Sequence, residues 1–168
     1  RCKMTVIVAI DPGKTACGVA IAVDGVLVKA GYPAPKKYRN EKPPRETVWA
    51  RPVHAANDFL RIEHAIGRID RLVIEMPKVY PGMPNTDLND LLDLAAVVGG
   101  LLEVIYYNEA RLVHPQEWKG QVPKKVMNAR VLSKLSSAEQ ATIEDAGAKT
   151  HNTLDAVGIL LYDLGRLK

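Results

Sequence analysis

At the start of the chain, apolar residues occur in short runs that are typical of strands rather than helices. Residues 5–10 (TVIVAI) are apolar or β-branched throughout, which predicts a central strand that is buried on both faces. Residues 16–23 and 26–30 are also rich in apolar residues, and Asp24-Gly25 between them is a strong signal for a two-residue hairpin turn. These segments predict three consecutive strands that form an antiparallel meander.

Helical spacing begins further along the chain. Residues 53–67 place apolar side chains three and four positions apart, which predicts a helix, and residues 71–75 (RLVIE) predict a short buried strand. A long helix is expected over 87–107, a strand over 111–114, and helices over 124–135, 137–146 and 153–166. This order predicts an α/β fold that resembles the ribonuclease H-like fold: a mixed five-stranded sheet, with the meander and two parallel strands, flanked by helices.

Two segments lack any apolar period. Residues 31–52 are rich in Pro, Lys and Arg, which predicts a long basic loop over about residues 33–52, and residues 80–85 (YPGMPN) predict a second loop. Loops as long as the first are usually functional or disordered. Because the chain has 168 residues and shows no internal repeat, we expect a single domain over residues 1–168.

Composition indicates an ordinary soluble protein, with 47% hydrophobic and 25% charged residues. No run approaches the roughly 20 apolar residues that a membrane-spanning helix needs. The two cysteines, Cys2 and Cys17, are not arranged in a CxxC pair, so we expect two reduced thiols and no zinc site. We expect the protein to work inside a cell, in the cytoplasm.

The net charge of +4 favours a polyanionic partner, and its distribution strengthens that expectation. The first basic segment, residues 36–51, carries Lys36, Lys37, Arg39, Lys42, Arg45 and Arg51. The second, residues 118–134, carries Lys119, Lys124, Lys125, Arg130 and Lys134 and no acid. Both are typical of surfaces that contact nucleic-acid phosphates, although a solvated basic face remains an alternative.

Three acidic residues stand at positions that are unusual for a carboxylate. Asp11 and Glu75 each end an apolar strand, and Asp155 lies within an apolar helix, on the same face as His151 and Asn152. Each acid also has a structural alternative: a turn-forming aspartate, a surface glutamate at a strand end, and an acid favoured by the helix dipole.

The combination of these acids is more informative than any one of them. In a fold with this strand order, two strand-end acids and one helix acid can meet at one point. Carboxylate oxygens with at most one imidazole suit Mg²⁺ or Mn²⁺. Two such ions about 4 Å apart can activate a water and stabilise the leaving oxygen in phosphodiester cleavage. We therefore expect about two divalent ions per site.

Three ordered motifs carry a resemblance to a known family. The segments Asp11-Pro-Gly-x-x-x-x-Gly18, Ile74-Glu75 and Asn152-x-x-Asp155-Ala156 resemble the signature segments of the RuvC family of Holliday junction resolvases. Their order, their spacing and the chain length agree with that family, and P-x-x-W-K-G at residues 115–120 is similar to phage-encoded forms. The resemblance implies a metal-dependent endonuclease of DNA recombination and repair, which resolves four-way junctions by paired phosphodiester cuts.

The resemblance also implies roles for individual residues. Asp11, Glu75 and Asp155 are expected to hold the metal. Members of the family usually place an aspartate or histidine three or four residues before the last acid, and this chain has Asn152 and His151 there. Either the neutral oxygen of Asn152 or the imidazole of His151 is therefore expected to complete the metal site.

Expected DNA contacts follow from the same resemblance. The basic segment of the family matches Lys119 and Lys124 or Lys125, and Lys124 is also expected to act in catalysis near the cut. Family members place an aromatic wedge after the strand-end glutamate; Tyr80 is the nearest candidate, and an ordinary loop tyrosine is the alternative. Further expected contacts are Lys78 and, in the basic loop, Lys36, Lys37 and Arg39. The basic loop has no counterpart in the family, and a mobile spacer is the alternative.

The expected partners are a four-way DNA junction and a second copy of the chain, with no membrane and no organic cofactor. In the family a long helix forms the homodimer interface, and the apolar side of residues 88–105 permits this. A symmetric dimer suits a nearly two-fold symmetric junction, because two identical sites can make paired cuts.

Three other functions are weighed against this one. A related nuclease that processes pre-ribosomal RNA also begins with an Asp-x-Gly strand, but resembles this chain less around residues 74–77. A junction-binding protein that has lost cleavage is suggested by Asn152 in place of an acid. The pattern Asp11-x-Gly13-x-Thr15 also resembles the phosphate loop of actin-like sugar kinases, which need two such domains where this chain has room for one.

Overall fold

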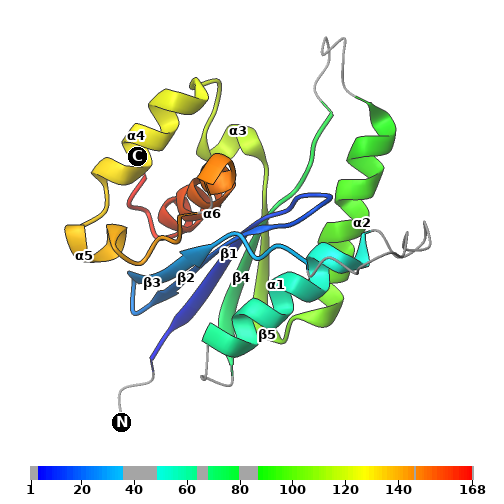
Figure 1. Ribbon diagram of the computed structural model, residues 1–168, viewed down its shortest axis with the longest axis horizontal. Helices are drawn as coiled ribbons and strands as arrows, with labels where there is room; N and C mark the ends of the chain where they lie inside the picture. The colour runs from blue at the N-terminus through cyan, green and yellow to red at the C-terminus, as the bar shows by residue number, and fades with distance from the viewer. Residues whose placement is uncertain (1–3, 36–48, 64–67, 80–86, 146, 168) are drawn as a thin grey trace.

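The computed structural model describes residues 4–35, 49–63, 68–79, 87–145 and 147–167, and its centre is a mixed five-stranded sheet (Figure 1). The strands are β1 (Val6–Asp11), β2 (Gly18–Val23), β3 (Val26–Gly31), β4 (Ile69–Glu75) and β5 (Tyr107–Val113). They lie in the order β3-β2-β1-β4-β5. Neighbours among β1, β2 and β3 are antiparallel, whereas β4 is parallel to both β1 and β5. The predicted meander with two added parallel strands is therefore confirmed.

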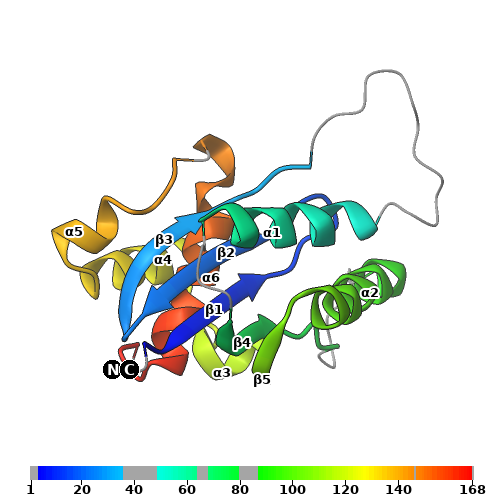
Figure 2. The same ribbon diagram turned by 90° about the horizontal axis from the view of Figure 1, so that it is seen from below.

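Helices cover both faces of this sheet. They are α1 (Ala50–Glu63), α2 (Leu88–Val104), α3 (Pro115–Trp118), α4 (Lys124–Ser133), α5 (Ser137–Gln140) and α6 (Thr150–Asp163), which a 3₁₀ turn (Gly147–Lys149) precedes. Helices α1 and α2 lie on one face, and α6 lies on the other face with α4 outside it (Figures 1 and 2). None of the described helices combines the length and apolar character that crossing a bilayer requires.

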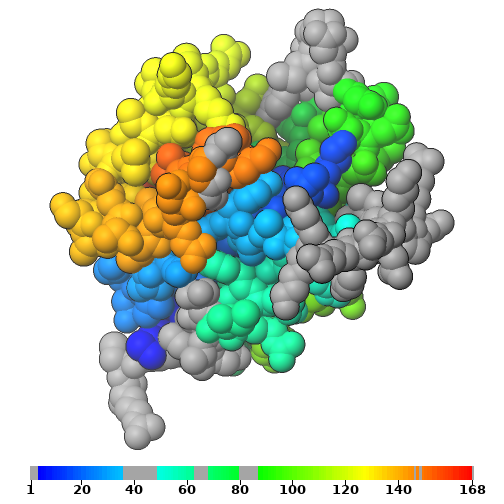
Figure 3. Space-filling model, viewed as in Figure 1, coloured from blue at the N-terminus to red at the C-terminus, as the bar shows by residue number. Residues whose placement is uncertain are grey.

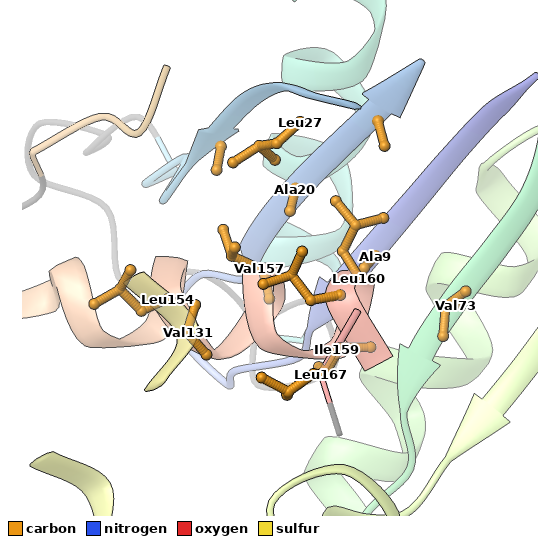
Figure 4. Packing of buried hydrophobic residues seen from close by; sticks show 14 of the residues in the cluster. Ala9, Ala20, Leu27, Val73, Val131, Leu154, Val157, Ile159, Leu160 and Leu167 are labelled. Atoms are coloured by element: carbon orange, nitrogen blue, oxygen red, sulfur yellow. The ribbon is translucent and has the colours of Figure 1, made fainter. Parts of the chain in front are cut away.

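Alternating side chains of the strands divide the core into two halves, as strand geometry requires. Val8, Ile10 and Leu72 face α1 and α2. On the other face, Ala9 and Ala20 pack beneath α6 (Figure 4). Because these two residues have short side chains, helix α6, which is buried over residues 153–161, lies close to the sheet.

The hairpin turn between β2 and β3 is the one that the sequence predicts. Asp24 and Gly25 have φ angles of 50° and 80°, as a type I′ turn requires. Cys17, just before β2, is a buried free thiol, and burial raises its pKa to about 12, so it stays protonated at neutral pH. Cys2 lies outside the described residues.

Several predicted boundaries differ from the structure. Helices α1 and α6 begin at Ala50 and Thr150, three residues before their predicted starts, and α3 was not predicted. Helix α2 ends at Val104, since the chain is already extended at Ile105 (ψ 132°) and strand β5 begins at Tyr107, earlier than predicted. The long α2 prediction was wrong at that end because β5 pairs along the whole of β4.

The predicted helix over residues 137–146 was wrong beyond Gln140. After α5 the chain extends along β3 instead of continuing as a helix. The Ala30 amide donates to the Thr142 carbonyl (3.1 Å), and the Glu144 amide donates to the Ala30 carbonyl (2.8 Å). These bonds to the sheet edge satisfy backbone groups that a helix would have used.

One buried carboxylate joins the C-terminal segment to the rest of the domain. Glu139 accepts hydrogen bonds from the Leu27 amide (3.1 Å) and the Ser136 amide (2.9 Å). Both Nη atoms of Arg166 also donate to Glu139, at 2.7 and 3.0 Å. Chiefly because of Arg166, the pKa of Glu139 is lowered from 4.5 to about 2.

We predict that Glu139→Gln lowers the free energy of unfolding at pH 7 by about 1.5–3 kcal/mol, since hydrogen bonds to a charged group are lost. The folded-state pKa lies below the unfolded one, so this contribution is present above about pH 4.5 and is lost as the pH falls toward 2. Urea unfolding at pH 7 and pH 3 measures both effects. The difference in stability between parent and variant should shrink at pH 3; a difference that does not change with pH contradicts the assignment.

Candidate active site

Asp11 and Glu75 are brought together by the sheet. Asp11 is the last residue of β1 and Glu75 the last residue of β4. These strands are parallel neighbours, with Ile10 opposite Ile74, so both acids emerge at the same edge. Asp155 reaches this edge from α6, the helix that packs on β1 and β2.

A glycine allows α6 to come close enough to deliver Asp155. In the β1–β2 ladder Asp11 is opposite Gly18. A Cβ atom at Gly18 would lie only 2.1 Å from the backbone oxygen of Asn152, in the first turn of α6. Only glycine permits this contact, so the signature Gly18 sets the approach of the helix to the end of β1.

The three acids lie close enough to affect one another electrostatically. The pKa of Asp11 is raised well above its ordinary value, first by burial and then by the negative charges of Glu75 and Asp155. The positive charges of Lys119 and Lys124 act in the opposite direction. Glu75 and Asp155 are thus close enough to Asp11 for their charges to act on it, and burial together with these charges destabilises ionised Asp11.

Three side chains from the second basic segment, residues 118–134, lie next to the carboxylates of Glu75 and Asp155. Trp118 Nε1 donates to Glu75 Oε2 (2.6 Å), and Lys119 Nζ lies 3.3 Å from the same oxygen. Lys124 Nζ lies 3.7 Å from Asp155 Oδ2. The lysines thus supply positive charge at two of the three carboxylates.

The donor set fits a hard divalent cation. All three acids offer carboxylate oxygens, the ligands preferred by Mg²⁺ and Mn²⁺. The Glu75 and Asp155 side chains are 14% and 10% exposed, so they are sheltered but not sealed. Across the described parts of the chain, however, no group of three or more Asp, Glu, His or Cys side chains is already assembled as a metal site. Closer convergence of the carboxylates is therefore needed before they share an ion.

Four of the remaining predicted site residues lie in the described part of the chain, and four lie outside it. His151 and Asn152 lie half-buried in the first turn of α6, while Lys78 and Lys125 are exposed. The space-filling view shows the turn after β1 (blue) and the start of α6 (orange) at the surface between α4 (yellow) and α2 (green) (Figure 3). Tyr80, Lys36, Lys37 and Arg39, with most of the predicted basic loop, lie outside the described residues.

Trp118 was not predicted as a site residue. The sequence showed it only as part of the P-x-x-W-K-G run, and its contact with Glu75 bridges 43 positions of the chain. The available signal was a tryptophan directly before Lys119, in a polar segment that follows a strand.

Comparisons with known proteins agree on the fold. No protein-family model matches this sequence, and no curated protein matches it. The structure of T. thermophilus RuvC in complex with a Holliday junction substrate aligns with a TM-score of 0.59 at 20% identity, over 94% of this chain and 91% of that one. A further Thermus thermophilus RuvC structure gives 0.53 at 19% identity, over 98% and 99%. The chain therefore has the ribonuclease H-like fold of RuvC, as predicted.

We predict that Gly18→Ala lowers stability by about 1–3 kcal/mol, because the added methyl group overlaps backbone that cannot rotate away. Gly99→Ala is the matched control: a Cβ there meets no atom within 4 Å, and alanine in a helix is favoured over glycine by about 1 kcal/mol. Thermal unfolding of both variants checks this. Equal melting temperatures for the two would contradict the close approach of α6 to β2.

Proposed function

We propose that this protein is a divalent-metal-dependent endodeoxyribonuclease that resolves four-way DNA junctions by paired phosphodiester cuts. The observation that carries the proposal is that Glu75 and Asp155 lie close enough to Asp11 to raise its pKa, with a lysine at the Glu75 carboxylate and another at the Asp155 carboxylate. Support comes from the fold, because the RuvC structure with the same fold is in complex with a Holliday junction substrate.

Asp11, Glu75 and Asp155 are the proposed metal ligands, and Asn152 or His151 completes the set. Two divalent ions held by these residues would supply an activated water and stabilise the leaving oxygen. Lys119 and Lys124 lie beside the ligands, where an ammonium group can contact the phosphate that is cut and offset its negative charge.

The proposed DNA surface extends outward from the acids. Lys119 directly follows α3, Lys124 and Lys125 begin α4, and Lys78 is exposed three residues after Glu75. The proposed contacts of Tyr80, Lys36, Lys37 and Arg39 rest on the sequence alone.

The proposed homodimer places two such sites on one junction. Helix α2 offers a surface for it, because Leu88 and Leu92, one turn apart, are 63% and 68% exposed. Exposed apolar residues grouped in this way are typical of an interface. A two-fold dimer would present its sites to opposite strands.

Loss of cleavage with retained junction binding is the second candidate function. Asn152 in place of an acidic ligand favours it, as does the absence of a pre-assembled metal cluster from the described residues. Junction cutting with Mg²⁺ or Mn²⁺, compared with binding alone in Ca²⁺, separates the two candidates. Adding structured RNA as a competitor tests the remaining alternative, an RNA-processing nuclease.

We predict that Asp11→Asn or Glu75→Gln lowers the rate of junction cutting in Mn²⁺ by about 1000-fold, since several kcal/mol of transition-state stabilisation depend on the bound ions. Junction affinity in Ca²⁺ should change by less than about 3-fold, since the lysines still neutralise phosphates. Gel-shift and cleavage assays on one junction measure both quantities. If binding falls as far as cutting, the acids have a structural role.

We predict that replacing Lys124 and Lys125 together by alanine weakens junction binding and flattens its dependence on salt. Each lost phosphate contact reduces the slope of log affinity against log salt by about 0.9, so two contacts reduce it by about 2. Lys29→Ala is the control, because Lys29 lies on β3 and pairs with Glu144 (2.8 Å). An unchanged slope in the double variant would place the DNA elsewhere.

A further inference from the structure

Trp118 is almost fully buried and points a hydrogen-bond donor at a proposed metal ligand. Its side chain is 5% exposed, and its Nε1 lies 2.6 Å from Glu75 Oε2. Lys119 Nζ lies 4.6 Å from the centroid of the indole ring and 3.3 Å from the same Glu75 oxygen. The contacts of Trp118 Nε1 and Lys119 Nζ with Glu75 are therefore both with Oε2, and neither is with Oε1.

The indole is held in place by the helix that carries Asp155. A Cβ atom at Gly158 would lie 2.4 Å from Cζ3 of Trp118, so the ring packs directly against the backbone of α6. Gly158 follows Asp155 by three residues and shares its side of the helix. Trp118 thus contacts both the acid at the end of β4 and the helix that supplies Asp155.

We propose that Trp118 is a positioning residue for Glu75: its N–H fixes one carboxylate oxygen and so orients the other for a divalent cation. The inference rests on the proposed function, because it assumes that Glu75 binds metal. A free glutamate side chain has several rotatable bonds, and holding it in one orientation reduces the entropy lost when a cation binds. Hydrogen bonds of this kind commonly change metal affinity by about 10–100-fold.

The test is a Mn²⁺ titration of the full chain without DNA, in which electron paramagnetic resonance measures free Mn²⁺. Trp118→Phe keeps an aromatic ring and removes the N–H, so the affinity for Mn²⁺ should fall by about 10-fold or more. Trp49→Phe is the matched control, since Trp49 lies directly before α1 and is 41% exposed, and this variant should bind Mn²⁺ as the parent does.

A second variant separates the N–H from the packing of the ring. Incorporating 3-benzothienylalanine at position 118 replaces the N–H by sulfur in a ring of nearly the same shape. Its Mn²⁺ affinity should fall as far as that of Trp118→Phe, while its melting temperature stays close to that of the parent. If it binds Mn²⁺ like the parent, packing alone matters and the positioning role is overturned.

The outcome also distinguishes this inference from the proposed function. If the parent binds Mn²⁺ and cuts junctions, and both Trp118 variants bind Mn²⁺ with unchanged affinity, only the positioning role fails. If the parent binds no Mn²⁺ and cuts no junction, the metal-dependent nuclease fails and the positioning role fails with it.

Discussion

Repulsion among three carboxylates at one edge of the sheet is the constraint on which the site depends. Burial and the charges of Glu75 and Asp155 raise the pKa of Asp11, so the ionised form of Asp11 needs positive charge nearby. Lys119 and Lys124 supply part of it from a segment outside the sheet. A fold that brings such acids together must therefore also bring cations to them. This requirement explains why the basic segment that follows β5 returns to the ends of β1 and β4.

Small residues make that arrangement sterically possible. Gly18 admits the backbone of α6 beside the end of β1, and Gly158 admits the ring of Trp118 against the same helix. Ala9 and Ala20 have short side chains, which leave room for α6 to pack close to the sheet. The helix can thus lie close to the sheet, with Asp155 buried yet near Asp11. The precision of the site comes from contacts that a single methyl group would disturb.

Local patterns predicted the features that depend on local interactions. The apolar run before Asp11 predicted β1, and Asp24-Gly25 predicted the hairpin turn. The segment after Gln140 was predicted as a helix because its pairing with Ala30 is non-local, joining parts of the chain that are more than 100 positions apart. The contact of Trp118 with Glu75 is non-local in the same way. The proposal that the acids converge came only from combining strand order with motif order.

The two lysines connect the proposed metal site with the proposed DNA surface. An ammonium group that neutralises Glu75 or Asp155 has less capacity to neutralise a phosphate, since its three donors serve both. Under the proposed function, cations bound to the acids would release Lys119 and Lys124 for DNA, and phosphates that engage these lysines would leave the acids in need of cations. Because such coupling is reciprocal, each ligand favours the binding of the other. The charge arrangement would thus link the assembly of the metal site to the presence of its substrate.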